Sequence, residues 1–535
     1  MHYTLLTFLL LLSAAFLLIL LARRLKIAYP IFLVLAGLVI GVIPGMPEIK
    51  IEPELIFLIF LPPLLYEAAW YTSWNDFWKW KRPISLLAFG LVFFTSTVVA
   101  YMASSFIPGF TLATGFLLGG IISPPDAIAA ASVLKTIRVP KRILTILEGE
   151  SLVNDASSLI VFRFALVATV AGSFSFQEAS VSFVMVPLMG TIIGLAVAYL
   201  IYLIHRFLPT TASIDSAFTL IAPYLMYLAA EELHYSGVMA VVSGGLFLSY
   251  RSHEIFADGQ SRLQTVNVWS TISIILNGLV FILIGLELPS IVAGLEGYSI
   301  AEACKYGLLV SALVILIRMI WIFPSTFIPR WLFKSVRDKE PHPGWKGSII
   351  IGWAGMRGVV SLAAALSLPL TLNNGNPLPE RNLIIFITFV VILVTLVFQG
   401  LTLPFIIKAL KIEEIDPTMP EEKQESEIRF RLTSAALHRL EDKHKDEIPG
   451  NDLLINLKME LENHLKDTHR RLECMECIEK DQKELRVYRH VLKDIYHTQR
   501  TELYHIRKEK IYSDEVIRSE EMQVDIDEIR VSTRK

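Results

Sequence analysis

Two carboxylates stand beside other oxygen-bearing side chains within long apolar stretches of this sequence. One ends the run Ser-Pro-Pro-Asp at residues 123–126, and the other is Asp155, five residues after Glu150 in the run Glu-Ser-Leu-Val-Asn-Asp. Two consecutive prolines remove two backbone donors and clash with the preceding turn, so a helix should break beside Asp126. A helix broken inside a membrane exposes carbonyl oxygens next to the carboxylate, which is typical of cation sites in secondary transporters. The competing interpretation is a proline kink in which Asp126 accepts a hydrogen bond from a neighbouring helix.

Helical spacing groups the polar residues around Asp155. Glu150 and Asn154 are four residues apart, as are Ser151 and Asp155, so two stripes of oxygen-bearing side chains share one helical face. A hard cation such as Na⁺ binds several oxygens and at least one negative charge, which Asp155, Ser151 and the Asp126 region offer together. The competing interpretation is a helix start whose acids lie near the positive end of the dipole, although Asp155 lies deep for that role.

A buried arginine in the segment Gly-Trp-Ala-Gly-Met-Arg-Gly at residues 352–358 needs a partner. A charge at membrane depth must be paired or must face a water-filled cavity. We expect Arg357 to form a bidentate ion pair with Glu150, which would neutralise both charges and hold two helices in register. Spacing cannot establish this pair, because the two residues lie far apart in the chain.

Three further charged residues lie inside apolar segments. Glu67 follows Leu-Pro-Pro at residues 61–63, so we expect a second proline-broken segment there. Glu67 then either lines a cytoplasmic or central cavity or accepts a hydrogen bond from a residue that contacts the cation site. Arg163 and Arg318 are interpreted as packing or pairing residues.

The composition shows what kind of fold must position these residues. Of the 535 residues, 53% are hydrophobic and 19% are charged, and the mean hydropathy is +0.52, which excludes an ordinary soluble enzyme. About 20 apolar residues form a helix that crosses a bilayer. Thirteen such segments predict an all-α membrane domain over residues 1–410; they lie near 4–22, 28–44, 54–71, 83–105, 110–134, 143–172, 182–205, 215–231, 236–250, 267–289, 303–325, 347–370 and 382–408.

The distribution of basic residues predicts the orientation. The first segment has no basic residue before it and is followed by Arg23, Arg24 and Lys26, so it is an uncleaved anchor with its N-terminus outside. Alternate loops then hold about 20 Lys and Arg on the cytoplasmic side and three outside. An odd number of spans places the C-terminus in the cytoplasm. We therefore expect a multi-pass protein of the cell membrane.

Residues 411–535 form a different, charged part of the chain. They hold 24 Lys and Arg against 30 Asp and Glu, with helical patterns at 426–446, 451–471 and 480–510. Seven of the twelve histidines lie here, so this cytoplasmic domain either senses pH or is simply a set of solvated helices. Cys474 and Cys477 form a lone CxxC that is a weak zinc motif. Three cysteines exclude a disulfide scaffold, and neither part is basic enough to indicate nucleic acid.

Three motifs together resemble a known family. Ser-Pro-Pro-Asp in the fifth segment, Glu-Ser-x-x-Asn-Asp in the sixth and Gly-Met-Arg-Gly in the twelfth look like the monovalent cation:proton antiporter-1 family of NhaP-type and NHE-type Na⁺/H⁺ exchangers. The resemblance covers residues 1–410. It implies thirteen helices with inverted repeats of spans 1–6 and 8–13, broken fifth and twelfth helices that cross in a mobile core, and a homodimer.

The resemblance also implies residue roles. Asp155 matches the carboxylate for which cation and proton compete, and Asp126 matches a second essential carboxylate. Ser151 and Glu67 are similar to residues that help to coordinate the cation, and Asn154 is a further candidate ligand.

Two other matches complete the comparison. Glu150 and Arg357 match a buried core ion pair of that family. One departure is that Pro125 stands where many bacterial members have Thr, and Ala127 replaces the usual Pro, which should shift the break by two residues and remove a ligand at position 125.

These patterns favour an electroneutral antiporter that exchanges Na⁺ or Li⁺ for H⁺ by alternating access and needs no cofactor. Asn154 is neutral where electrogenic relatives place a second aspartate, which favours one cation per proton. K⁺/H⁺ exchange by the same fold is the nearest alternative. A gated cation channel or a membrane sensor that uses the charged tail is the second. A membrane enzyme is disfavoured, because no nucleophile–base pair appears at helical spacing.

Overall fold

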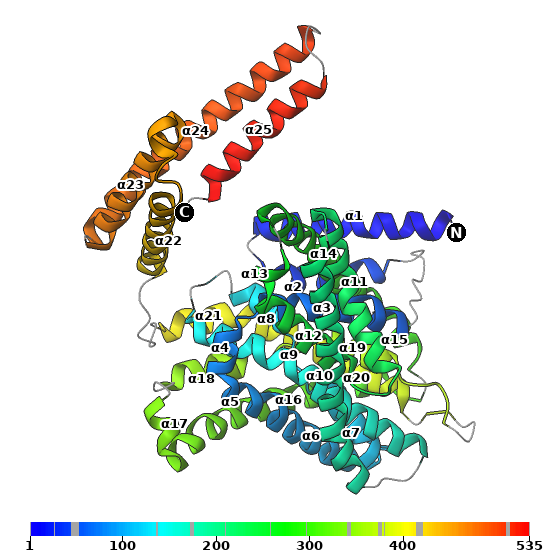
Figure 1. Ribbon diagram of the computed structural model, residues 1–535. Coiled ribbons are helices and arrows are strands. Elements are labelled where there is room, and N and C mark those ends of the chain that lie inside the picture. The colour runs from blue at the N-terminus through cyan, green and yellow to red at the C-terminus, as the bar shows by residue number, and fades with distance from the viewer. Residues whose placement is uncertain are drawn as a thin grey trace. The chain divides into compact units, whose positions relative to one another are not determined.

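The computed structural model consists of helices joined by short connections (Figure 1). In the residues it describes, the single β-type pairing is an isolated bridge between Thr371 and Pro377. The all-helical fold class is therefore confirmed. The structure describes residues 2–25, 27–43, 53–134, 137, 139–171, 176–208, 210–256, 258–295, 297–339, 344–372, 377–378, 380–412, 421–473, 475–509 and 514–533.

The chain divides into two compact units, Met1–Asp416 and Pro417–Lys535. Helices lie at each of the thirteen predicted segments of the first unit. Its elements are α1 (His2–Leu25), α2 (Tyr29–Gly41), α3 (Pro53–Tyr71), α4 (Trp74–Lys79), α5 (Lys81–Ser85), the π-helical η1 (Leu86–Leu91), α6 (Val92–Phe106), α7 (Leu112–Ile122), α8 (Ala127–Leu134), α9 (Lys141–Ala171), α10 (Phe176–Phe207), α11 (Ala212–Glu231), α12 (Gly237–Tyr250), α13 (Ser252–Ile255), α14 (Gly259–Leu286), α15 (Leu288–Ala293), α16 (Ile300–Leu332), α17 (Lys334–Lys339), α18 (Gly344–Trp353), α19 (Val359–Leu366), α20 (Arg381–Leu393), the π-helical η2 (Val394–Gln399) and α21 (Gly400–Leu410).

Several helices are long enough and apolar enough to cross a membrane. Seven in the described part of the chain meet this requirement by length and composition, and α2, α7 and α12 are shorter apolar helices. The helices satisfy their own backbone groups, as lipid requires. Their starts carry ordinary caps: Thr111, Ser236 and Ser299 each accept a backbone N–H at the beginning of α7, α12 and α16. The count of thirteen crossings stays a prediction.

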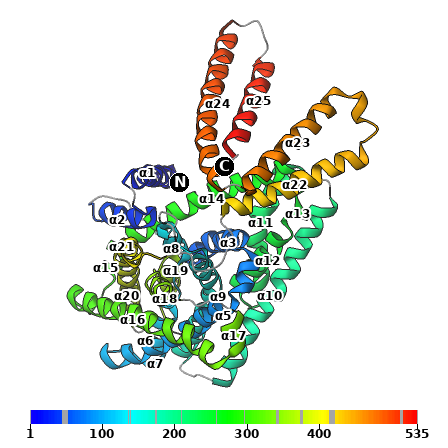
Figure 2. The ribbon, with the colours of Figure 1, turned by 90° about the vertical axis from the view of Figure 1, so that its left-hand side faces the viewer.

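The helices of the first unit pack in two groups. The first helix group contains α1, α2, α3, α10, α11, α12 and α14, and the second helix group contains α5, η1, α6, α7, α8, α9, α16, α18, α19, α20, η2 and α21. Glycines allow backbones to approach closely inside each group: a Cβ at Gly37 of α2 would lie 2.4 Å from the Ile282 carbonyl oxygen of α14, and a Cβ at Gly119 of α7 would lie 2.7 Å from Ser96 of α6. The groups meet along α2, α3, α10, α12 and α14 of the first group and α8, α9 and α19 of the second (Figure 2).

Helix α3 corrects one expectation. Pro62 and Pro63 lie inside it, and the helix continues through both to Tyr71. Pro63 cannot donate to the Ile59 carbonyl, but the Tyr224 hydroxyl of α11 donates to that oxygen at 3.1 Å. Because a neighbouring helix satisfies the freed carbonyl, the prolines do not break α3.

In the described residues of the second unit, the α-helices are α22 (Glu421–Lys443), α23 (Asp452–Glu473), α24 (Met475–Glu509) and α25 (Asp514–Thr533). A short 3₁₀ segment, Ile448–Gly450, lies between α22 and α23, where Pro449 and Gly450 favour a turn. Lys458 of α23 pairs with Glu441 of α22 at 2.8 Å. Helices α24 and α25 lie side by side (Figures 1 and 2).

One motif of this unit falls outside the description. Cys474 lies outside the described residues and the side chain of Cys477 is not described, so the CxxC hypothesis has no structural outcome.

Candidate functional site

The predicted break beside Asp126 is present. Helix α7 ends at Ile122, residues 123–126 are not helical, and α8 begins at Ala127. Pro124 and Pro125 explain the interruption, since neither can donate to the preceding turn. Asp126 then begins the next helix: its Oδ1 accepts from the backbone N–H of Ile128 at 2.8 Å and of Ala129 at 3.4 Å.

A second break crosses the first. Helix α18 ends at Trp353 and α19 begins at Val359, with extended backbone between them. The Asp126 backbone N–H donates to the Met356 carbonyl at 2.6 Å, so the two interrupted segments bond to each other. Gly358 lies directly on the carboxylate, because a Cβ there would be 1.9 Å from Asp126 Oδ2. Only glycine allows this approach.

Arg357 satisfies backbone carbonyls within the crossing. Its Nε donates to the Ile122 carbonyl at 3.0 Å, and its Nη1 donates to the Gly355 carbonyl. Its own backbone N–H donates to Thr395 Oγ1 at 3.0 Å. The end of α7 leaves carbonyls without helical partners, and a fully buried guanidinium supplies donors to them. Arg357 therefore joins the two breaks.

The expected pair of Glu150 with Arg357 is wrong, because the structure pairs Glu150 with Arg318 of α16. Arg318 Nη1 donates to Glu150 Oε1 at 2.6 Å and Nη2 donates to Oε2 at 2.8 Å, in the bidentate geometry that suits a guanidinium. Both side chains are 1% exposed or less. Arg318 reaches this position across Gly355, where a Cβ would lie 2.3 Å from its Cδ. It also donates to the Ile351 carbonyl at 3.1 and 3.2 Å.

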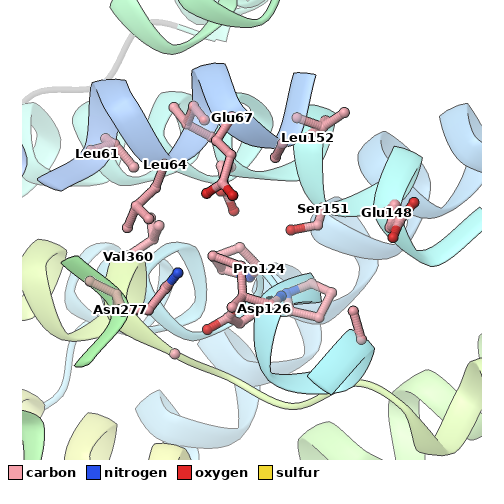
Figure 3. Close-up of a pocket in the computed structure, with 18 of the residues that line it drawn as sticks. Leu61, Leu64, Glu67, Pro124, Asp126, Glu148, Ser151, Leu152, Asn277 and Val360 are labelled. Carbon is pink, nitrogen blue, oxygen red and sulfur yellow. Dashed lines mark hydrogen bonds between the residues drawn. The ribbon is translucent and has the colours of Figure 1, made fainter. Parts of the chain in front are cut away.

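A cavity of about 300 Å³ opens where the two helix groups meet (Figure 3). Four of the predicted site residues line it: Glu67 of α3, Asp126 of the first break, and Ser151 and Asp155 of α9. Figure 3 shows the Glu67 carboxylate directed from α3 toward the side of Asp126, and the Ser151 hydroxyl directed into the same space from α9. The structure therefore brings oxygens from three separate segments to one cavity.

Three predicted site residues lie outside the cavity lining. One is Arg357, which joins the two breaks. Of the other two, Glu150 is held by Arg318, and Asn154 is fully buried beside Asp155 in the chain. Both amide atoms of Asn154 lack a hydrogen-bond partner among the described residues. Arg163 pairs with Glu231 of α11 at 2.5 Å, which agrees with its interpretation as a pairing residue.

Several cavity residues carried no motif in the sequence. Tyr29 lines it from α2, Ser273 and Asn277 from α14, and Gly358 and Ser361 from the second break and α19. Only Gly358 had a usable signal, as part of the glycine-rich segment. A single Asn or Ser in an apolar helix has no spacing that identifies its neighbours.

A smaller pocket of about 20 Å³ lies between the same helix groups. Val280, Ile284 and Glu287 of α14 form one wall, and Val359 and Ala363 of α19 form the other. Val359 and Ala363 also line the large cavity. One short stretch of α19 therefore separates two hollows, each of which contains a carboxylate.

The polar groups that line the large cavity are mainly oxygen ligands. Carboxylate, hydroxyl and amide oxygens suit a hard cation. In the described part of the chain, no three His, Cys, Asp or Glu side chains gather closely enough to hold a resident metal ion.

Comparison with known proteins decides the family. The family described as sodium/hydrogen exchanger, transmembrane, matches residues 11–409. The chain belongs to this family. It is a family of multi-pass membrane antiporters and not of enzymes.

Named relatives cover most of the chain. The sodium, potassium, lithium and rubidium/H(+) antiporter of Bacillus pumilus is 35% identical over 394 residues, which are 71% of this chain and 58% of that protein. This chain thus spans little more than half of that relative. An uncharacterized Na(+)/H(+) exchanger of Mycobacterium bovis is 34% identical over 83% of this chain and 80% of its own length. The low-affinity Na(+)/H(+) antiporter NhaS1 of Synechocystis is 31% identical over 78% and 76%.

The fold matches a solved structure from this family. The sodium proton antiporter MjNhaP1 of Methanocaldococcus jannaschii at pH 8 superposes with a TM-score of 0.59 at 21% identity, over 76% of this chain and 98% of that one. An electron microscopy structure of the same antiporter gives 0.60 at 19% identity, over 78% and 100%. Family and fold therefore agree.

Proposed function

We propose that this chain exchanges Na⁺ or Li⁺ for H⁺ and that both ions compete for Asp155 and Asp126. The observation that carries the proposal is the cavity between the two helix groups, which both carboxylates line together with Glu67 and Ser151. An ionised carboxylate can bind a cation, whereas a protonated carboxyl group cannot, so the cation and the proton compete for the same group. Competition requires only that its proton affinity be comparable with the working pH.

The position of the cavity supports alternating access as part of this proposal. Both aspartates lie in the second helix group, whereas Glu67 belongs to the first. Movement of one group against the other carries the bound ion from one side of the membrane to the other, as in other secondary transporters with broken helices. The inverted repeat of spans 1–6 and 8–13 belongs to this proposal.

Charge around the breaks supports a one-for-one exchange. Arg318 neutralises Glu150, which leaves Arg357 against Asp126 and Asp155. We propose that Asp126 and Asp155 share one exchangeable charge, which either one Na⁺ or one H⁺ neutralises. Such a cycle moves no net charge and is indifferent to voltage, whereas one transported charge would be worth about 2.3 kcal/mol per 100 mV. Na⁺ flux in vesicles clamped at different potentials tests this count, and a flux that follows the potential overturns it.

The main experiment measures Na⁺ uptake by reconstituted vesicles under an imposed pH gradient. Asp155→Asn and Asp126→Asn should each abolish uptake in a folded, inserted protein, because an amide keeps the shape but neither releases a proton nor neutralises a cation. Asp215→Asn is the matched control, since Asp215 is a buried aspartate outside the cavity, paired with His205 at 2.9 Å. Normal uptake by the Asp155 variant would show that the assignment is wrong.

K⁺ is the second candidate cation. The Bacillus pumilus relative is named for sodium, potassium, lithium and rubidium, so selectivity within the family extends to larger ions. Parallel uptake of Na⁺, Li⁺, K⁺ and Rb⁺ in the same vesicles identifies the preferred ion. The same assay separates an exchanger from a channel, because only an exchanger moves the cation uphill when driven by pH alone.

The wider arrangement is part of the same proposal. We place the chain in the cell membrane as a homodimer with thirteen crossings, its N-terminus outside and residues 411–535 in the cytoplasm. The excess of Lys and Arg in alternate loops supports this orientation. Protease protection of a terminal tag in sealed cells tests it.

A further inference from the structure

Asn277 of α14 is a polar side chain inside the interface of the two helix groups. It is 3% exposed, and its Nδ2 donates to Ser273 Oγ at 3.1 Å one turn earlier. Its Oδ1 has no hydrogen-bond partner among the described residues. Asn277 nevertheless lines the large cavity, and Figure 3 shows its amide group at that space with the nitrogen directed into it.

Two other oxygens at this cavity also lack a hydrogen-bond partner among the described residues. Asp126 Oδ2 and Ser361 Oγ are both buried, and neither has a partner among the described residues. Both residues line the cavity with Asn277. Buried polar oxygens are nearly always satisfied, so three unsatisfied oxygens from three different elements at one cavity indicate a ligand that they share.

The two sides of this set belong to different helix groups. Asp126 and Ser361 lie on the breaks and α19 of the second group, whereas Asn277 lies on α14 of the first. Helix α14 is held closely against α2, because a Cβ at Gly285 would lie 2.3 Å from the Val34 carbonyl oxygen. Asn277 is therefore fixed to the first group, and its distance from Asp126 depends on how the groups are placed.

We propose that Asn277 Oδ1 is a direct ligand of the transported cation, on the wall of the cavity formed by the first helix group. The proposal rests on the exchange function proposed above and adds a ligand that is not part of the carboxylate machinery. An amide oxygen coordinates a cation but does not exchange a proton at working pH. Asn277 thus favours the cation-loaded state over the proton-loaded state and contributes to the choice between Na⁺ and K⁺.

The transport experiment compares wild type with Asn277→Ala and Asn277→Ser in vesicles. Loss of the ligand should raise the half-saturating Na⁺ concentration about tenfold while leaving the maximal rate and its pH profile unchanged, because only cation binding is weakened. Asn277→Ser keeps an oxygen on a shorter side chain, so its half-saturating Na⁺ concentration should lie between those of wild type and Asn277→Ala. Asn267→Ala is the matched control, since Asn267 is an exposed asparagine of the same helix, and it should match wild type.

A binding measurement separates this proposal from the exchange function. Na⁺ should raise the thermal unfolding midpoint of purified wild type in detergent, and Asn277→Ala should need about ten times more Na⁺ for the same rise. If wild type moves no Na⁺ at all, the proposed function fails and this titration still decides the ligand. Half-saturation within twofold of wild type for Asn277→Ala, or a lower maximal rate alone, would overturn the role of Asn277.

Discussion

The Glu150–Arg318 pair is a buried, bidentate ion pair in the first unit, and removing one partner should destabilise that unit measurably. Arg318→Met keeps an unbranched side chain but leaves the Glu150 carboxylate buried without a counter-charge. Breaking a buried ion pair in this way costs about 3–5 kcal/mol. The Ile351 carbonyl also loses both of its bonds from Arg318, which adds about 1 kcal/mol.

The expected shift follows from the size of the unit. With an unfolding entropy of about 2.1 cal/mol/K per residue over some 400 residues, a loss of about 5 kcal/mol lowers the unfolding midpoint by about 6 °C. Thermal unfolding of purified protein in detergent, followed by tryptophan fluorescence, measures it. Adding Glu150→Gln removes the stranded charge, so the double variant should recover at least half of the loss.

Arg357 provides the control for this reasoning. It is equally buried, but its side chain donates to the Ile122 and Gly355 carbonyls and not to Glu150. Arg357→Met should therefore be destabilising, and Glu150→Gln should not rescue it. Rescue of Arg357→Met together with no rescue of Arg318→Met would refute the pairing described above.

Three further predictions concern other parts of the molecule. Gly358→Ala should abolish cation uptake or insertion, because its Cβ would lie 1.9 Å from Asp126 Oδ2. Gly259→Ala is the control and should be neutral, since nothing lies within 4 Å of a Cβ there. Uptake by both variants at the wild-type rate would contradict the close contact between the two helix breaks. The hydrogen bond from Lys458 lowers the pKa of Glu441 from 4.5, so the contact between α22 and α23 contributes stability above that pH and loses it as the pH falls through the lowered pKa. Hydrogen exchange of α22 and α23 in the full chain, corrected for intrinsic rates, should show this loss, and Lys458→Met should remove it. Deleting the charged C-terminal unit should leave vesicle uptake intact and alter its pH dependence, since every proposed ligand precedes it; complete loss in an inserted protein would place that unit within the transport machinery.

Local chemistry in the sequence was enough to predict the break beside Asp126 and part of the site, whereas the break between α18 and α19 was expected only from the family resemblance. Two adjacent prolines before Asp126 interrupt a helix wherever they stand unsupported, and spacing on α9 places Ser151 and Asp155 together. Pro62 and Pro63 show the limit of that rule. Their helix continues because a hydroxyl from α11 satisfies the freed carbonyl, and no local pattern reports a contact between distant helices.

Tertiary placement decided the rest of the site. Arg318 and Arg357 are both single arginines in apolar segments, so either could have been the partner of Glu150. The geometry of α16 beside Gly355 made the choice. Asn277 was missed for the same reason, since one amide in an apolar helix resembles any other packed polar residue until its unsatisfied oxygen and the cavity are seen together.

The stretch of α19 that separates the two hollows affects how efficiently a proton gradient is converted into a cation gradient. Val359 and Ala363 border both the large cavity and the small pocket at Glu287, and they are about one helical turn apart. If both hollows opened at once, Na⁺ and H⁺ would run down their gradients independently, and each pH unit of proton gradient, worth about 1.36 kcal/mol, would dissipate as heat. Under the exchange mechanism proposed above, we expect these two uncharged side chains to limit the leakage of ions between the two hollows. Enlarging or shrinking them should change the number of ions lost per productive cycle, even in a protein whose carboxylates are intact.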